Sequence, residues 1–159
     1  MNPSKFRIQR ISPADISLME SLLDTFGEAF DEQETYGSNR PTTNYLQQLL
    51  SSDYFIALAA LKAKQVIGGI AAYELKKFEQ ARSEIYIYDL AVALPERRKG
   101  VATALISGLE AIAKQRGAYV VFVQADVGDD PAISLYSKLG MREEVLHFDI
   151  AVKTSNDAT

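Results

Sequence analysis

The sequence predicts a three-layer α/β or α+β sandwich, in which helices cover both faces of a mixed, largely antiparallel sheet. Two observations predict this fold. Segments with strand patterns outnumber segments with helical patterns, and helices alternate regularly with strands only in the second half of the chain. The 159 residues suit one domain. We expect that domain to span residues 1–152, followed by a C-terminal tail over residues 153–159.

The first half of the chain is expected to form three strands and two helices. Ser12 and Pro13 are expected to begin the first helix, as its N-cap and first turn. Gly68 and Gly69 interrupt the third strand and indicate a bulge or a close approach of another segment. The expected strands cover residues 5–11, 54–61 and 65–75. The expected helices cover residues 12–30 and 42–50.

The second half is expected to alternate strands with helices. The first of these strands, SEIYIYDLAV, is rich in β-branched and aromatic residues. The apolar run YVVFVQ predicts a strand covered on both faces. Asp130, before Pro131, is expected to be the N-cap of the last helix. The expected strands cover residues 83–92, 119–124 and 142–152. The expected helices cover residues 100–115 and 131–139.

The composition excludes several kinds of chemistry. The chain has no cysteine, so disulfides, zinc–thiolate sites and a cysteine nucleophile are excluded; its single histidine leaves a multi-histidine metal site without ligands. We therefore expect no metal. The net charge of −4 argues against a nucleic-acid partner and accommodates a cationic one. No signal-peptide core and no apolar run of about 18 residues occur, so we expect a cytoplasmic protein without a membrane partner.

A basic loop containing a glycine joins the strand over residues 83–92 to the helix that follows. The first N–H groups of a helix lack intrahelical partners, and the helix dipole adds positive potential, so such a junction can bind an anion. Arg97, Arg98 and Lys99 would reinforce that potential, and Gly100 would leave room for close backbone approach. A solvated basic turn is the alternative interpretation.

Two motifs resemble those of the GCN5-related N-acetyltransferases. RRKGVA at residues 97–102 fits [QR]-x-x-G-x-[GA], the coenzyme A pyrophosphate loop of that family. AISLYSKLGM at residues 132–141 resembles its A-x-x-LY-x-KLGF segment, with Met141 in place of Phe. More narrowly, four further segments look like the aminoglycoside 3-N-acetyltransferases of type I. These segments are residues 55–60, 77–92, 117–132 and 142–150.

The resemblance implies the GCN5-related acetyltransferase fold and an enzyme that uses acetyl-CoA as co-substrate. The implied reaction moves the acetyl group to the 3-amino group of the deoxystreptamine ring of aminoglycoside antibiotics, which confers resistance. Because no cysteine can carry a covalent acetyl group, we expect direct transfer in a ternary complex. The acceptor would be a polycationic small molecule. A homodimer is compatible with exposed strand edges.

Two catalytic roles follow from the resemblance. Asp89 is the expected general base. By strand alternation it shares a face with Ile85, Ile87 and Ala91, so we expect its carboxyl to be desolvated and its pKa raised. The alternative is a structural carboxylate at a strand bulge. Tyr136 matches the family tyrosine that protonates the coenzyme A thiolate, and a packed tyrosine is the alternative.

The remaining expected site residues bind the co-substrate or the acceptor. Backbone groups at Leu90, Ala91 and Val92 would pair with the pantetheine arm, and an N–H near Leu90 would meet the oxyanion. The expected pyrophosphate ligands are Arg97, Arg98, Lys99, Gly100, Val101, Ala102 and Thr103. The expected acidic ligands of the acceptor are Asp126, Asp129, Asp130 and, from an early acidic stretch, Glu32. A solvated acidic surface is the alternative for this early stretch. Glu84 is expected to point away from Asp89.

Two rival functions remain open. The first keeps the fold and acetylates a polyamine, another small amine or a protein amine. The second is a non-catalytic acyl-CoA-binding module, which would need the loop at residues 97–102 but neither Asp89 nor Tyr136. Testing a panel of acceptors with acetyl-CoA distinguishes the first rival from an aminoglycoside acetyltransferase. Measuring turnover in variants of Asp89 and Tyr136 distinguishes the second.

Overall fold

A computed structural model describes residues 5–156, and its contacts divide the chain into two compact units, residues 1–124 and 125–159. The strands of the first unit are β1 Arg7–Arg10, β2 Phe55–Lys62, β3 Gln65–Lys76, β4 Ser83–Val92 and β5 Ala118–Val123. Its helices are α1 Ile16–Phe30, α2 Thr43–Ser51 and α3 Val101–Arg116, with a π-helix η1 Glu34–Ser38 and a 3-10 helix η2 Leu94–Glu96. The second unit contains the helix α4 Asp130–Leu139.

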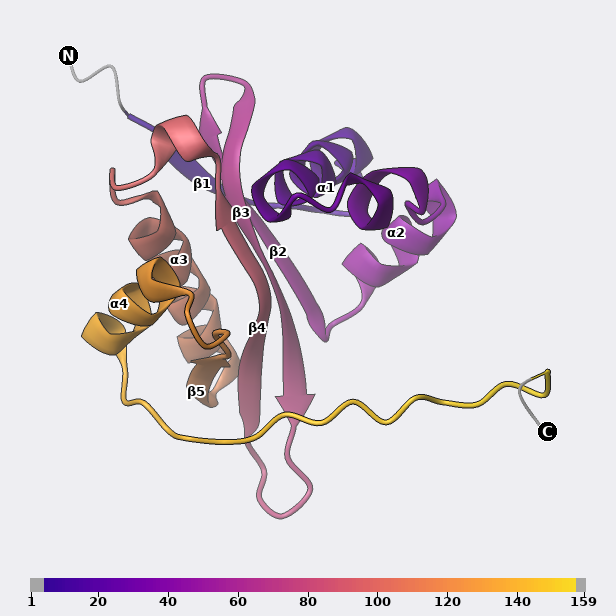
Figure 1. The fold of residues 1–159 in the computed structure, drawn as a ribbon, viewed down its shortest axis with the longest axis vertical. Helices are drawn as coiled ribbons and strands as arrows, with labels where there is room; N and C mark the ends of the chain where they lie inside the picture. Colours follow the sequence, from indigo (N-terminus) through magenta and orange to yellow (C-terminus); the bar gives the residue numbers. More distant parts are fainter. Residues whose placement is uncertain (1–4, 157–159) are drawn as a thin grey trace. The chain divides into compact units, whose positions relative to one another are not determined.

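The five strands form one mixed sheet in the order β1-β2-β3-β4-β5. The first four are antiparallel neighbours, and β5 runs parallel to β4 because the crossover helix α3 connects them. Helices α1 and α2 lie on one face and α3 on the other (Figure 1). The predicted fold class is therefore confirmed. Tyr119 and Val120 of the edge strand β5 are exposed, so the prediction that both faces of this strand are covered is wrong.

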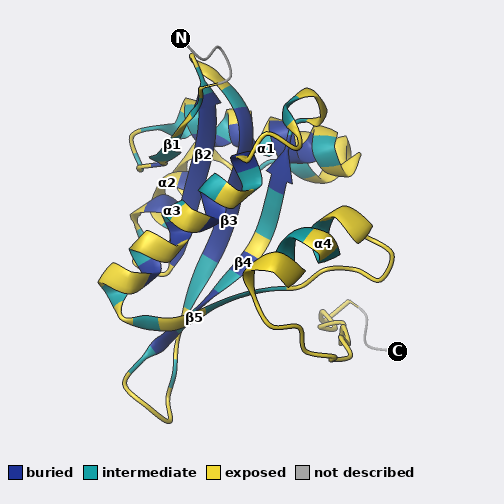
Figure 2. Cartoon of the chain, turned by 90° about the vertical axis from the view of Figure 1, so that its left-hand side faces the viewer, coloured by how far each residue is buried: buried dark blue, intermediate teal, exposed yellow. Residues whose placement is uncertain are grey.

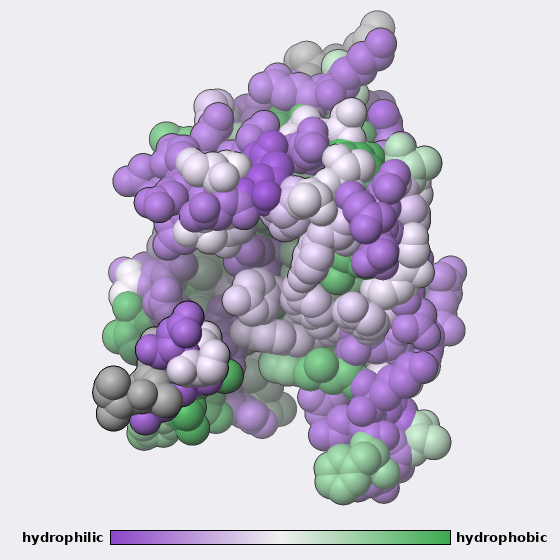
Figure 3. Space-filling model, turned by 90° about the vertical axis from the view of Figure 1, so that its right-hand side faces the viewer, coloured by the Kyte–Doolittle hydropathy of each residue, from purple (hydrophilic) through white to green (hydrophobic). Residues whose placement is uncertain are grey.

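The core of the first unit lies between the sheet and the helices on its two faces. Leu22 and Phe26 of α1 are fully buried on one side, and Leu105 and Leu109 of α3 on the other. Figure 2 shows the central strands buried and α3 with its exposed side turned outward. The surface on the side of α1 and α2 is mostly hydrophilic (Figure 3). Each helix thus buries one apolar stripe, as helices that cover a sheet do.

Gly68 and Gly69 permit close packing at the centre of β3. A Cβ added at Gly69 would lie 2.1 Å from Cδ1 of Leu22, so α1 packs directly on this backbone. A Cβ added at Gly68 would lie 2.8 Å from the carbonyl oxygen of Ala91 in β4. The β2–β3 register also shifts beside them, which leaves Ile67 as a bulge residue. Both features predicted from the two glycines are present.

The first helix begins later than predicted. It starts at Ile16 with Asp15 in the N-cap position, and Ser12 is not the cap. The Ser12 hydroxyl instead donates a hydrogen bond to the Asp15 carboxylate at 2.9 Å. Ser and Asp side chains compete for local partners before a helix, and here they bond to each other. By contrast, Thr42 caps α2 and accepts a hydrogen bond from the N–H of Tyr45 at 3.2 Å.

The strand predicted over residues 142–152 does not form. Residues 141–154 have neither helix nor strand, and Phe148 and Ile150 are 78% and 90% exposed. Alternating polarity predicts the two faces of a strand, but a strand also needs a partner for its backbone hydrogen bonds. The sheet of the described residues consists of β1–β5 alone. Residues 142–152 thus have the alternating polarity of a strand but pair with none of the strands β1–β5.

Candidate active site

Within residues 5–156, no strand pairs with one edge of β4 over its second half. β5 pairs with residues 83–87 of β4 only, whereas β3 pairs with β4 as far as Val92. The edge of residues 88–92 that faces away from β3 therefore offers backbone donors and acceptors to a ligand. The carbonyl of Val92 is already used, because it accepts a hydrogen bond from Nε of Arg97 at 2.9 Å. An extended ligand could add to this edge in strand fashion.

The loop after β4 ends in a row of unpaired backbone N–H groups. In the described part of the chain, the N–H groups of residues 98–103 have no backbone acceptor; the first such bond of α3 runs from Ala104 to Gly100 at 3.0 Å. Arg98 and Gly100 adopt left-handed φ values of 62° and 83°, which turn these groups toward the start of α3. A turn of this kind at a helix N-terminus suits a pyrophosphate. The chain therefore fits the group that its sequence predicts.

Two of the three basic side chains of this loop, Arg97 and Lys99, have partners within the chain. Arg97 fastens the loop to β4 through the carbonyl of Val92. Lys99 lies 3.4 Å from Glu96, and the same carboxylate pairs with Lys62 at 3.1 Å. A Cβ added at Gly100 would meet nothing within 4 Å, so its positive φ, rather than a close approach within the chain, requires the glycine.

A β-bulge in β4 decides which way Asp89 faces. In the β3–β4 ladder Ala72 pairs with Ile87. The next pair is Ala71 with Asp89, which leaves Tyr88 as an extra residue. Paired residues share a face of the sheet and consecutive residues do not, so Asp89 lies on the face opposite Ile87. That is the face covered by α1, where Ala71 belongs to the buried core.

The bulge overturns two expectations from simple strand alternation. Asp89 shares a face with Ala91, as predicted, but not with Ile85 or Ile87. Glu84 lies on the same face as Asp89, contrary to prediction. It is engaged elsewhere, because its carboxylate pairs with Lys77 at 3.0 Å. Simple alternation fails here because a bulge adds one residue to the strand. Residues after the bulge therefore point to the opposite face from the one that alternation predicts.

The carboxylate of Asp89 is half-buried and hydrogen-bonded. The hydroxyl of Tyr36 donates to its Oδ2 at 2.9 Å. Burial raises the pKa of Asp89 above its ordinary value, the hydrogen bond from Tyr36 lowers it, and the charge of Glu32 raises it further; the balance is a raised pKa. The direction matches the expectation. A raised pKa makes a carboxylate a stronger proton acceptor, which suits a general base.

A cluster of aromatic side chains lies near enough to Asp89 for its charge to raise the pKa of Tyr73 and of Tyr86. Tyr73 and Tyr88 meet edge to face with ring centroids 5.9 Å apart, and Tyr86 meets Tyr88 in the same way at 5.9 Å. Tyr86 also stacks on Phe122 at 4.8 Å. Tyr88 is 62% exposed, so its ring is accessible from solvent. Aromatic faces beside a carboxylate attract cations and pack against sugar rings.

The second unit contains the other predicted residues. Asp129, rather than Asp130, is the N-cap of α4, and its side chain accepts a hydrogen bond from the N–H of Ala132 at 3.4 Å. Asp130 is the first helical residue, so the predicted cap is wrong by one position, and Asp126 is exposed in the preceding turn. Burial raises the pKa of Tyr136, and the charge of Asp129 raises it further. Tyr136 therefore stays protonated at neutral pH, as a proton donor must.

The described residues, 5–156, contain no group of three or more histidine, aspartate or glutamate side chains arranged to hold a metal ion. Within the same residues, no helix is long and apolar enough to cross a membrane.

These features are those of a GNAT acetyltransferase, and the family assignment rests on direct similarity. The Acetyltransferase (GNAT) family model matches residues 17–141, so the chain belongs to this family. Among solved structures, it is similar to an aminoglycoside acetyltransferase from an uncultured soil metagenomic sample. The two share 62% sequence identity over 94% of this chain and 99% of that one, with a TM-score of 0.92.

Two further similarities are more distant. A second soil metagenomic aminoglycoside acetyltransferase, solved in complex with sisomicin, is 29% identical over 93% of this chain and 97% of that one, with a TM-score of 0.87. An N-alpha-acetyltransferase of Sulfurisphaera tokodaii is 29% identical over 96 residues, which are 54% of this chain. The chain spans 58% of the length of that relative.

Sequence reasoning missed the residues that surround Asp89 from other elements. Tyr36 comes from η1 and Tyr73 from β3, both distant from Asp89 in the sequence. One local signal pointed to Tyr36: it is the single aromatic residue within the polar segment DEQETYGSNR. Gly27, which interrupts a helical pattern, is a second signal, because an added Cβ there would lie 3.3 Å from Cβ of Tyr36.

Proposed function

We propose that this protein transfers the acetyl group of acetyl-CoA to the 3-amino group of the deoxystreptamine ring of aminoglycosides, by direct transfer in a ternary complex. The observation that carries the proposal is the 62% identity, across nearly the full length of both chains, to an aminoglycoside acetyltransferase. The choice of the 3-amino group rests on the type I resemblance of residues 77–92 and 117–132.

The geometry of the first unit supports acetyl-CoA as co-substrate. The unpaired N–H groups of residues 98–103 would bind the pyrophosphate, and the free edge at Leu90, Ala91 and Val92 would pair with the pantetheine arm. When bound, acetyl-CoA supplies the acetyl group as a reactive thioester. Donors fixed along the backbone before charge develops stabilise a transition state without reorganisation.

The acceptor amine requires a base, because an aminoglycoside amine is largely ammonium at neutral pH. Asp89 would take the proton from the ammonium, and the nitrogen lone pair then forms the bond to the acetyl carbon. Asp89 would release that proton to solvent and take the second proton from the nitrogen as the carbon–sulfur bond breaks. Tyr136 would protonate the departing thiolate and later recover its proton from solvent. Glu32 would supply negative charge that suits a polycationic acceptor. In the second unit, Asp126, Asp129 and Asp130 would do the same.

The proposal is tested by coenzyme A release with acetyl-CoA and gentamicin, with spermidine as the comparison acceptor. We expect turnover with gentamicin and little with spermidine, and NMR of the product should locate the new amide on the 3-amino group. Turnover with spermidine alone would favour the polyamine rival. Coenzyme A binding without turnover in a broad amine screen would favour a non-catalytic module.

A second test addresses Asp89 directly. We expect Asp89→Asn to lower kcat by about 10²- to 10⁴-fold, because the amide cannot accept the proton. The matched control is Asp53→Asn, which changes a carboxylate that is 80% exposed and pairs only loosely with Lys76 at 3.7 Å. If Asp89→Asn retained the wild-type rate, Asp89 would not be the base.

A further inference from the structure

A segment that sequence analysis left unassigned reaches the proposed catalytic base. η1 is a π-helix that follows α1, and Tyr36 lies at its centre. π-helical turns are rare and often occur at functional sites. The hydroxyl of Tyr36 donates to Oδ2 of Asp89 at 2.9 Å, across 53 positions of sequence. Among the described residues, no side-chain hydrogen bond to the other oxygen, Oδ1, is made.

Two aromatic rings of α1 pack against the ring of Tyr36. Its ring centroid lies 5.9 Å from that of Phe26 and 5.8 Å from that of Phe30, both on α1. Gly27 lets η1 lie close to α1, because a Cβ added at Gly27 would be only 3.3 Å from Cβ of Tyr36. The N–H of Tyr36 donates to the carbonyl of Glu32 at 3.1 Å.

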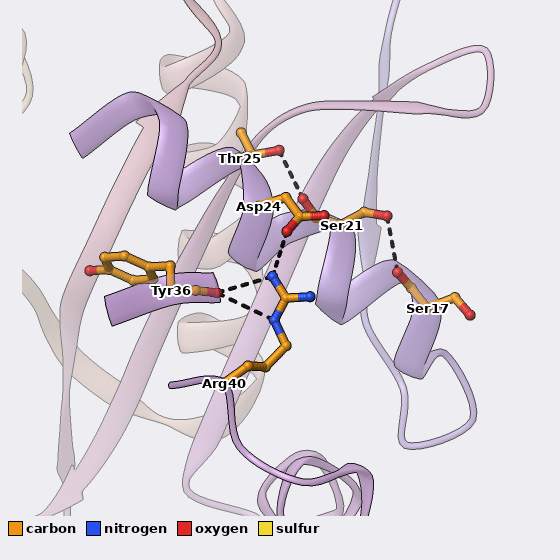
Figure 4. A network of polar contacts seen from close by, with 6 residues as sticks. All are labelled: Ser17, Ser21, Asp24, Thr25, Tyr36 and Arg40. Atoms are coloured by element: carbon orange, nitrogen blue, oxygen red, sulfur yellow. Dashed lines mark hydrogen bonds and ion pairs between the residues drawn. The ribbon is translucent and has the colours of Figure 1, made fainter. Parts of the chain in front are cut away.

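An ion pair anchors the backbone of the same residue. Nε and Nη2 of Arg40 donate to the carbonyl oxygen of Tyr36 at 3.3 Å and 3.0 Å. Nη2 of Arg40 also pairs with the carboxylate of Asp24 on α1 at 2.5 Å. Figure 4 shows the guanidinium between Asp24 and the main chain of Tyr36, while the phenol ring extends to the other side. The Asp24–Arg40 pair thus ties η1 to α1.

We propose that Tyr36 is a positioning residue for acetyl transfer: it holds the Asp89 carboxylate through Oδ2, leaves Oδ1 for the acceptor ammonium, and is itself held by the Asp24–Arg40 pair. This inference rests on the proposed function, because it assigns Asp89 as the base. A carboxylate fixed through one oxygen presents the other in a defined direction, and small misplacements of a catalytic group are costly.

The charged and polar groups around Asp89 predict the direction in which its pKa changes when a neighbour is removed. Burial, and then the hydrogen bond to Asp89, raise the pKa of Tyr36 well above its ordinary value, so the phenol remains a donor at any working pH. Two titratable groups, Tyr36 and Glu32, shift the pKa of Asp89. Asp89 in turn raises the pKa values of Tyr73 and Tyr86. Tyr36 lowers the pKa of Asp89, whereas Glu32 raises it. Removing each should therefore move the titration of Asp89 in opposite directions.

The first test follows Asp89 without any turnover. The carboxyl carbons of protein labelled with ¹³C-aspartate are titrated by NMR, and the Asp89 signal is assigned by its loss in Asp89→Asn. We expect Tyr36→Phe, which keeps the ring packing, to raise the titration midpoint and Glu32→Gln to lower it. Tyr54→Phe, at an exposed tyrosine that is not among the groups shifting the pKa of Asp89, should leave it unchanged. An unchanged midpoint in Tyr36→Phe would overturn the inference whatever the enzyme's activity.

The second test is the pH profile of kcat/KM with gentamicin. We expect the acid limb of Tyr36→Phe to move to higher pH, with kcat/KM about three- to tenfold lower on that limb. Arg40→Gln keeps the phenol but frees its backbone, so we expect a roughly tenfold lower kcat on the plateau. If the NMR titration midpoint of Asp89 rises in Tyr36→Phe while the pH profile of kcat/KM stays unchanged, a role of Tyr36 in catalysis is refuted. Failure of the wild-type protein to acetylate any aminoglycoside would overturn the proposed function, while the NMR titration still decides the hydrogen bond.

Discussion

Replacing Gly68 by alanine tests whether the sheet is packed as tightly at the candidate active site as the structure indicates. The added Cβ would lie 2.8 Å from the carbonyl oxygen of Ala91, 3.3 Å from Cα of Val92 and 3.4 Å from Cγ1 of Val101. The first two neighbours are backbone atoms of β4, which cannot rotate away. Opening the shortest contact from 2.8 Å to an ordinary 3.4 Å requires a movement of about 0.6 Å.

That movement has a cost in stability and a cost in binding. Overpacking by one methyl group costs about 1–3 kcal/mol, and the lower chain entropy of alanine returns about 0.5–1 kcal/mol. We therefore expect the free energy of unfolding to fall by roughly 0.5–2 kcal/mol, and Tm by about 1–8 °C. Because Ala91 and Val92 form the proposed pantetheine edge, we also expect KM for acetyl-CoA to rise about tenfold.

Urea unfolding measures the first effect, and steady-state kinetics with varied acetyl-CoA measure the second. Gly37→Ala is the matched control, since a Cβ added there meets nothing within 4 Å. Gly68→Ala with wild-type stability and an unchanged KM for acetyl-CoA would refute the close approach of β3 to β4. Lost stability with an unchanged KM would refute the use of this edge by the co-substrate.

Three further predictions address the acid, the core and a buried ion pair. Tyr136→Phe should lower kcat about 10²-fold with little change in KM for acetyl-CoA, and an unchanged kcat would remove the acid role. Leu22→Ala should lower the free energy of unfolding in urea by about 2–5 kcal/mol, because Leu22 is fully buried; a loss within measurement error would contradict the packing of α1 on β3. Burial alone would raise the pKa of Glu74, but hydrogen bonds from Ser83 and Arg116 lower it on balance. The ionised Glu74 therefore stabilises the fold at pH values above the pKa of glutamate in the unfolded chain, about 4.3. This stabilisation is lost as the pH falls through the lower pKa that Glu74 has in the folded protein. Glu74→Gln should cost about 1.5–3 kcal/mol at pH 7 and progressively less below about pH 4.3, and a pH-independent difference in urea unfolding would argue against this assignment.

Local sequence predicted β4, α3 and the loop that joins them. The strand over residues 83–92 was predicted with the bounds that the structure has, and α3 begins and ends within one residue of its prediction. β-branched and aromatic residues favour a strand over a short range, and a glycine marks each end of α3, so both signals lie within the segment itself. The unpaired N–H groups of residues 98–103 follow from the same junction of loop and helix.

Tertiary structure alone decided what surrounds the base. The bulge at Tyr88 exists only in the register of β4 with β3, so alternation within β4 could not predict that Asp89 turns toward α1. The contact from Tyr36 depends on Gly27 and on the Asp24–Arg40 pair, which bring η1 against α1 and over the sheet. The C-terminal pattern over residues 142–152 failed for a related reason, because alternation encodes faces but not a pairing partner. Sequence determines which residues prefer strand, helix or turn; the register between strands and the packing of distant segments determine which of them meet.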